Sequence, residues 1–282
     1  MTDTESLLQS RSFVELGARQ RARAVLDPGS FRELLGPFDR LMSPWLPRQG
    51  IVPQADDGVV IAKGRLNERQ TVVAAIEGGF QGGSMGEVGG AKIAGALELA
   101  IEDNRNGIPT CAVLLLETGG VRLQEANLGL AAIAEIQAAI VELRAWQPVI
   151  GLIAGSVGCF GGMSIAAGLC SHLLVTREAR LGLNGPQVIE QEAGIGEYDA
   201  KDRPFIWSLT GGEQRHASGL VDGYVADDTD ALRERLLQLL DAPSTDRASQ
   251  HAWFLGRLAR LGDDCPQLDA AAVRALYQGE AQ

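Results

Sequence analysis

The chain has 282 residues, of which 45% are hydrophobic and 22% charged, and its 36 acidic and 25 basic residues give a formal net charge of −11. This composition is typical of a globular protein with a full core, and the acidic excess argues against nucleic acid or an anionic membrane surface as the main partner. The four cysteines show no C-x-x-C spacing, and three lie in apolar stretches. We therefore expect buried reduced thiols, with neither a disulfide framework nor a zinc site.

The polar, acidic start MTDTESLLQS predicts no signal peptide, and no apolar run reaches the ~18 residues of a membrane span. Both features predict a soluble, cytoplasmic protein. The first forty residues are expected to be helical, because Ser12–Glu15 and Ser30–Glu33 both fit the capping-box pattern. Residues 58–64 and 71–76 then predict a β-hairpin, with residues 67–70 as its turn.

A strand, a glycine-rich turn and a helix follow one another three times in the middle of the chain. The repetition predicts a layered α/β fold with several backbone-lined turns along one edge of a sheet. We expect three regions: a helical and loop segment over 1–57, the α/β domain over 58–240 and a helical tail over 241–282. The predicted elements are a glycine-rich stretch over 77–90 before a helix over 91–104, a strand over 112–117 before a helix over 126–144, a strand over 149–154 with a loop over 155–162 and a short helix to 169, and a last strand over 173–176.

The most informative of these turns contains Gly119 and Gly120, between the predicted strand and the long helix. Amides at a helix start are unpaired and lie at the positive end of the helix dipole, and glycine lets a ligand approach them. The pair therefore predicts a cradle for an anion or oxyanion, and Gly161-Gly162 predicts a second one. Tight packing of strand against helix is the plainer explanation of both pairs, and a solvated helix start is the plainer one for Arg122 and Glu125.

Other glycine-based sites are less well supported. Neither G-x-G-x-x-G nor G-x-x-x-x-G-K-[ST] occurs, and the chain has only three lysines, which argues against dinucleotide and nucleotide binding. Gly82-Gly83-Ser84-Met85-Gly86 matches the G-x-S-x-G pattern of hydrolases, which also requires an acid and a histidine. So short a pattern occurs by chance in a glycine-rich stretch, and we expect Ser84 to be a helix N-cap.

Four ordered stretches resemble the carboxyltransferase branch of the crotonase-like superfamily. Asp27–Phe31 resembles the opening segment of that branch, and Gly82–Gly86 its glycine-rich turn. Thr118–Glu125 resembles its S-G-G-A-R-M-Q-E signature, and Asn184–Gln191 its A-G-P-R-V-I-E-Q signature. The resemblance covers roughly residues 13 to 230.

Within that branch the chain is most similar to the malonate decarboxylase beta-subunit family. It lacks the four-cysteine zinc ribbon of the bacterial acetyl-CoA carboxylase beta subunit, and Arg40–Gly50 and Thr118-Gly-Gly-Val resemble malonate decarboxylase instead. The resemblance implies a crotonase-like spiral of ββα units. It also implies that the chain, with a gamma subunit at whose junction the active site lies, decarboxylates malonyl groups on an acyl-carrier subunit.

The same resemblance implies no cofactor bound by this chain: the carrier presents malonyl on a phosphoribosyl-dephospho-CoA arm, and an alpha subunit loads malonate by acyl exchange. Two other functions remain open, a carboxyltransferase that moves the carboxyl group to biotin and a non-catalytic assembly subunit. The proton donor to the enolate is also open. The backbone groups of Gly119, Gly120, Gly161 and Gly162 are the candidate catalytic groups, no metal is expected, and the candidate substrate-binding residues are Gly82, Gly83, Ser84, Arg122, Gln124 and Glu125.

Overall fold

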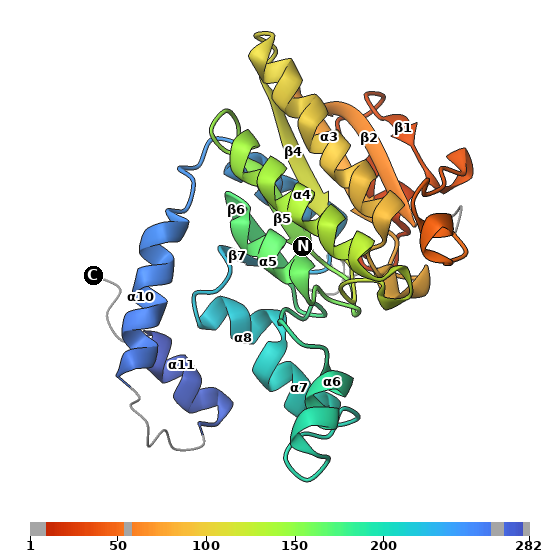
Figure 1. The fold of residues 1–282 in the computed structure, drawn as a ribbon. Helices are drawn as coiled ribbons and strands as arrows, with labels where there is room; N and C mark the ends of the chain where they lie inside the picture. Colours follow the sequence, from red (N-terminus) through yellow and green to blue (C-terminus); the bar gives the residue numbers. More distant parts are fainter. Residues whose placement is uncertain (1–9, 54–57, 261–267, 279–282) are drawn as a thin grey trace.

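The computed structural model describes residues 10–53, 58–260 and 268–278, and its centre is one seven-stranded sheet (Figure 1). The strands lie in the sheet in their order along the chain; β1 to β3 are antiparallel, and each later strand is parallel to the one before it. Both faces of the sheet are covered, which is why its parallel strands are almost continuously apolar. The strands are β1 (Arg32–Leu35), β2 (Val59–Leu66), β3 (Arg69–Ile76), β4 (Thr110–Leu115), β5 (Val149–Ile153), β6 (His172–Thr176) and β7 (Gly223–Val225).

Three helices cover one face: α3 (Glu87–Arg105), α4 (Asn127–Leu143) and α5 (Gly162–Leu169) (Figure 1). The buried positions of α4 recur every three or four residues, which gives the helix an apolar stripe toward the sheet. Gly90 lets α3 and α4 approach closely, because a Cβ at this position would lie 2.4 Å from the Cβ of Ala132. This face contains the larger of the two cores.

The other face is covered by α2 (Ala18–Val25) and α9 (Thr229–Leu239), which form a second core with the opposite sides of the strands. Helices α6 to α8 lie beyond the carboxyl edge of the sheet, and α10 and α11 lie to one side of it (Figure 1). No described helix is long and apolar enough to cross a membrane. The remaining helices are α6 (Pro186–Ala193), α7 (Arg203–Thr210), α8 (Gly212–Ala217), α10 (Arg247–Ala259) and α11 (Ala270–Gln278), with 3₁₀ turns η1 (Pro37–Asp39), η2 (Leu46–Gln49), η3 (Gln81–Gly83) and η4 (Leu123–Glu125).

The three strand–turn–helix units and the hairpin are confirmed, but the expected helices around residues 12 and 30 are wrong. Residues 32–35 form β1, because the hydroxyl of Ser30 accepts from the amide of Arg65 and the segment pairs with β2. The helix near the N-terminus begins only at Ala18. The hairpin turn is two residues long, with Asn67 and Glu68 both at positive φ, rather than four.

The expectation of buried reduced thiols is confirmed for Cys111, Cys159 and Cys170, which are all free and buried. The fourth cysteine, Cys265, lies outside the described residues. The boundaries predicted at residues 57 and 240 stay predictions.

Candidate active site

Four turns stack on one another at the carboxyl edge of the sheet. Isolated bridges join Met85 to Val121, Thr118 to Cys159, and Cys159 to Leu181. The turns that follow β3, β4, β5 and β6, called the first, second, third and fourth turn below, are thereby held in register. In open α/β sheets, ligands bind outside the carboxyl ends of the strands, so this stack is the natural place to look for a site.

The amides of Gly119 and Gly120, predicted to hold an oxyanion, are used to build the stack. The Gly119 amide donates to the carbonyl of Gly82 at 2.8 Å, and the Gly120 amide donates to Oγ1 of Thr118 at 3.1 Å. The carbonyl of Gly120 accepts in turn from the amide of Met85 at 2.7 Å. Any oxyanion donor in this turn must therefore be the next amide along the chain.

That next amide belongs to Val121, and it lies beside the second glycine pair. A Cβ on Gly161 would lie 3.3 Å from Gly120 Cα and 3.7 Å from the nitrogen of Val121, and φ of Gly120 is +109°. Only glycine at both positions allows the two turns to come this close. Within the described residues, the amides of Val121 and Gly162 donate to no acceptor of the chain.

Gly162 is the first residue of α5, so its amide points out of the helix start and adds the positive end of the helix dipole. The amide of Gly161 itself donates to the carbonyl of Leu183 at 2.7 Å, which ties this turn to the fourth one. Val121 and Gly162 are both partly exposed, so a ligand can reach them. The two predicted cradles therefore come together as one pair of free donors.

Arg122 and Glu125 are buried and paired, with 3% and 6% of their side chains exposed and 2.7 Å between Nη1 and Oε1. Arg122 also donates to Oγ and to the carbonyl of Ser84, and Oε2 of Glu125 accepts from the amide of Glu87, where α3 begins. The pair therefore braces the second turn against the first. Their binding of substrate stays a prediction, and this burial fits a positioning role better than direct contact.

Gly82, Gly83 and Ser84 support the same turn. The carbonyl of Gly82 accepts from the amide of Gly119. Gly83 leaves no room for a side chain, since a Cβ there would lie 1.9 Å from the carbonyl oxygen of Glu117. Ser84 is not the N-cap of α3, as the sequence predicted, because Gly86 occupies that position. Its hydroxyl accepts from Arg122, and no described histidine contacts it, so the hydrolase alternative lacks its base.

Two neighbouring side chains after the second turn are exposed. Gln124 is exposed, and its binding of substrate stays a prediction; the apolar Leu123 is 81% exposed. Cys159, in the third turn, is fully buried, and burial raises the pKa of its thiol far above the ordinary value, so it is no nucleophile.

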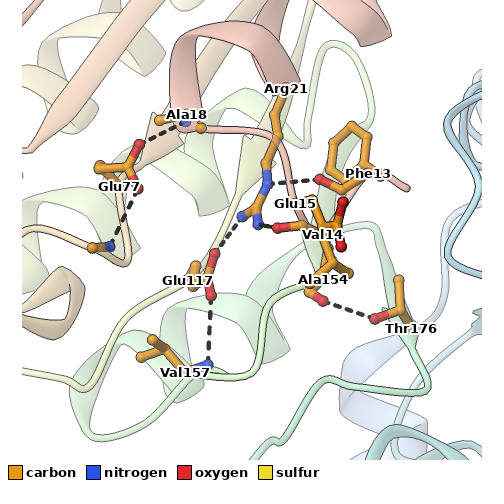
Figure 2. Close-up of polar contacts among 12 residues, drawn as sticks. Phe13, Val14, Glu15, Ala18, Arg21, Glu77, Glu117, Ala154, Val157 and Thr176 are labelled. Carbon is orange, nitrogen blue, oxygen red and sulfur yellow. Dashed lines mark hydrogen bonds and ion pairs between the residues drawn. The ribbon is translucent and has the colours of Figure 1, made fainter. Parts of the chain in front are cut away.

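Sequence reasoning missed Glu117 and Arg21, which form a buried ion pair directly behind the turns (Figure 2). Glu117 directly precedes Thr118-Gly-Gly, and an acidic residue at the end of an otherwise apolar strand was the available signal. The Val121 amide was also missed, since no side chain marks a free amide.

Comparison with known proteins places this geometry in a family. Residues 13–252 match the carboxyl transferase domain. The malonyl-S-ACP:biotin-protein carboxyltransferase MADC of Malonomonas rubra is 41% identical over 246 residues, which are 84% of this chain and 77% of that protein. The methylmalonyl-CoA carboxyltransferase 12S subunit of Propionibacterium freudenreichii subsp. shermanii is 32% identical over 82% of this chain, which spans 42% of that protein.

Among solved structures, a chain of a Pseudomonas malonate decarboxylase hetero-tetramer in complex with malonate is 71% identical, with a TM-score of 0.90. The match covers 98% of this chain and 100% of that chain. The resemblance drawn from the four sequence motifs and the crotonase-like fold that it implied are confirmed. The protein is thus a member of the carboxyl transferase domain family.

Proposed function

We propose that this chain is the beta-type subunit of a malonate decarboxylase and that it stabilises the enolate formed when a malonyl thioester loses CO₂. The observation that carries the proposal is the pair of unused amides, Val121 and Gly162, on two turns that glycine brings into contact. Two preplaced donors suit one oxygen on which negative charge develops. Similarity to a structure described as a complex with malonate supports a malonyl substrate.

Decarboxylation breaks the bond between the carboxylate carbon and the α-carbon of the malonyl group. The electron pair passes into an enolate whose charge lies on the thioester oxygen, and a proton then adds to the α-carbon to give the acetyl thioester. Donors held in place by the stacked turns need no reorganisation as this charge appears. The chain's own part is to orient the thioester carbonyl toward Val121 and Gly162; the proton donor is left open.

We propose that an acyl-carrier subunit presents the malonyl group on a phosphoribosyl-dephospho-CoA arm and that an alpha subunit loads malonate. A flexible arm suits this site, since the donors lie at the surface of the turns and the neighbouring Gln124 is exposed. The chain would then need no bound cofactor of its own.

A gamma subunit is the proposed partner over the mouth of the site. Exposed apolar side chains lie on η4, α4 and α5, the elements that follow the second and third turns along the chain: Leu123 is 81% exposed, Leu130 50% and Ile165 52%. Large exposed apolar side chains of this kind suit a protein interface. A partner there would exclude water from the donors and strengthen their effect on the enolate. Two matched structures are a hetero-tetramer and a hetero-dimer, which supports a heteromeric assembly.

Transfer of the carboxyl group to biotin is the second candidate, favoured by the 41% identical relative named as a malonyl-S-ACP:biotin-protein carboxyltransferase. The same amides would stabilise the same enolate, so the turns do not distinguish the two reactions. The fate of the carboxyl group does.

The test is CO₂ release from a malonyl thioester labelled in its free carboxyl group, using the chain co-purified with its gamma subunit and the carrier. We expect labelled CO₂ to appear at the same rate with avidin present. Release that stops with avidin, or label recovered on biotin, would favour the transferase. Activity that survives proline in place of Gly162 would favour the assembly-subunit alternative.

A further inference from the structure

Glu117 lies two residues after the end of β4, between Arg21 and the amide of Val157 (Figure 2). Its residue is 8% exposed, and its carboxylate is enclosed by glycine backbone. A Cβ on Gly78 would lie 2.6 Å from Cδ of Glu117, and one on Gly155 would lie 1.7 Å from Oε1. The carboxylate therefore fills the space between the first turn and the third. The backbone of Glu117 leads directly into the second turn.

The contacts of the carboxylate reach the two turns that carry the free amides. Oε1 of Glu117 accepts from the amide of Val157 at 3.5 Å, within the loop that ends at Gly162 (Figure 2). The backbone of Glu117 continues into Thr118, whose amide donates to the carbonyl of Gly158 at 2.7 Å. Moving this carboxylate would shift the Val121 turn relative to the Gly162 turn.

Arg21 holds the carboxylate from the other face of the sheet. It lies on α2, its Nη1 pairs with Oε2 of Glu117, and its remaining donors reach the carbonyls of Phe13 and Val14 (Figure 2). All three nitrogens of the guanidinium thus have acceptors inside the protein, and 6% of the side chain is exposed. Neither charge can bind a substrate directly, and each leaves the other unpaired if removed.

The neighbouring strand end repeats the link to α2. The carboxylate of Glu77, which follows β3, accepts from the amide of Ala18 at 2.9 Å and from that of Gly79 at 3.2 Å (Figure 2). Two successive carboxylates at the carboxyl edge therefore anchor turns to the same helix. Anchoring to a packed helix is a means of holding donors in place.

We propose that Glu117, held by Arg21, is a positioning residue that fixes the spacing between the Val121 and Gly162 amides. The effect on catalysis rests on the proposed function, whereas the effect on the geometry of the turns does not. A displacement of about 1 Å at a reacting group can lower a rate about 100-fold. The loss should fall on kcat rather than on KM, because the two amides act on a charge that develops only in the transition state.

Glu117→Gln tests this, with Asp222→Asn as the matched control. Asp222 forms a partly buried ion pair with Arg247 and accepts from the amide of Leu173 at the opposite edge of the sheet. In the complex with the gamma subunit, we expect Glu117→Gln to lower kcat by about 10- to 100-fold with little change in KM. Asp222→Asn should retain the wild-type kcat, and Glu117→Asp, which keeps the charge, should recover part of the lost rate.

Hydrogen exchange gives a readout independent of activity. Amides in segments 118–121 and 155–162 should exchange faster in Glu117→Gln than in Asp222→Asn. Equal exchange in these segments, or a kcat of Glu117→Gln within about twofold of wild type, would overturn the proposal. If the wild-type complex released no CO₂, the proposed function would fail, and the exchange rates would still decide whether Glu117 positions the turns.

Discussion

At the carboxyl edge of the sheet Glu117 and Arg21 form a buried ion pair, and at the amino edge Asp222 and Arg247 form a partly buried one. Asp222 accepts from the amide of Leu173 at 2.7 Å and from Thr245 at 2.6 Å, so it closes off the start of β6. Glu117 is enclosed chiefly by glycine backbone, and among the described residues one amide, that of Val157, donates to its carboxylate over a long distance of 3.5 Å.

Similar pairs of arginine and carboxylate therefore have different surroundings at the two edges of the sheet. At the amino edge, the carboxylate of Asp222 accepts from the backbone amide of Leu173, so that amide is paired. At the carboxyl edge, the ion pair of Glu117 lies behind the turns, and no acceptor in the described part of the chain pairs with the amides of Val121 and Gly162. Amides at a surface turn can bond to water, and these two can therefore exchange that water for an oxygen of a ligand.

The largest expected effect is on the brace between the first two turns. Arg122→Met leaves Glu125 buried without its cation, and we expect the free energy of unfolding to fall by about 3–5 kcal/mol. Urea unfolding followed by tryptophan fluorescence measures this. Arg105→Met is the matched control, because Arg105 and Glu142 are about half exposed and their pair contributes less than about 1 kcal/mol. Similar losses in both variants would contradict the role assigned to Arg122.

Removing one free amide sharpens the contrast between the edges. Gly162→Pro removes the N–H at the first position of α5, where proline fits the helix, and we expect kcat to fall about 10²- to 10³-fold. Gly162→Ala keeps the amide and adds only a Cβ 3.0 Å from Cγ2 of Ile133, so it should keep most of the activity. Equal kcat values for the two variants would remove Gly162 from the oxyanion site. Gly120→Pro is a poorer test, since its φ of +109° is closed to proline.

At the amino edge, we expect a change at Asp222 to alter the stability of the protein and its dependence on acid pH. Burial alone would raise the pKa of Asp222, but hydrogen bonds from Arg247, Thr245 and the Leu173 amide outweigh it and lower the pKa. A lowered pKa means that this stabilisation is present above the ordinary carboxyl pKa of about 4 and is lost as pH falls further.

Asp222→Asn should therefore cost about 2 kcal/mol at pH 7 and remove part of the acid sensitivity. Unfolding midpoints between pH 3 and pH 7 measure both, and the kcat of this variant at pH 7 is the control. A wild-type and a variant curve that stay parallel down to pH 3 would show that Asp222 titrates normally.

The smallest expected effect is on thiol labelling, where we expect no reaction at either edge of the native sheet. Cys159 lies in a carboxyl-edge turn and Cys170 at the amino edge, and burial raises the pKa of both thiols, that of Cys170 to about 12. Neither should react with iodoacetamide at pH 7.5 in the native protein, while both should react in urea. Peptide mass spectrometry checks this, and rapid native labelling of Cys159 would mean that the third turn opens.

Much of the fold could be predicted because the signals are local. Apolar runs such as Ala112–Leu116 and the periodic stretch over 126–144 reflect one or two buried faces, and glycine marks the turns between them. The helix expected from the Ser30–Glu33 capping box does not form, because the signal for the competing structure is not local. Pairing of residues 32–35 with β2 stabilises a strand more than one cap stabilises a short helix.

The sequence motifs pointed to the turns at the carboxyl edge, but the hydrogen bonds of individual amides within those turns could not be predicted. Gly119 and Gly120 appeared free because a strand-to-helix turn leaves amides without local partners, and the partner of Gly119, the carbonyl of Gly82, is distant along the chain. Arg122 and Glu125 appeared solvated because nothing in their spacing reveals that the first turn covers them.

By itself, the sequence determined the hairpin, the three strand–turn–helix units, the position of their glycine turns and the family to which their motifs belong, since the signals for all of these lie in contiguous residues. Only the tertiary structure decided which amides remain free and which charges are buried. Stacking four turns pairs some amides and leaves those of Val121 and Gly162 without an acceptor in the part of the chain that the structure describes. Long-range hydrogen bonds make that selection, and their partners come from segments far apart in the chain.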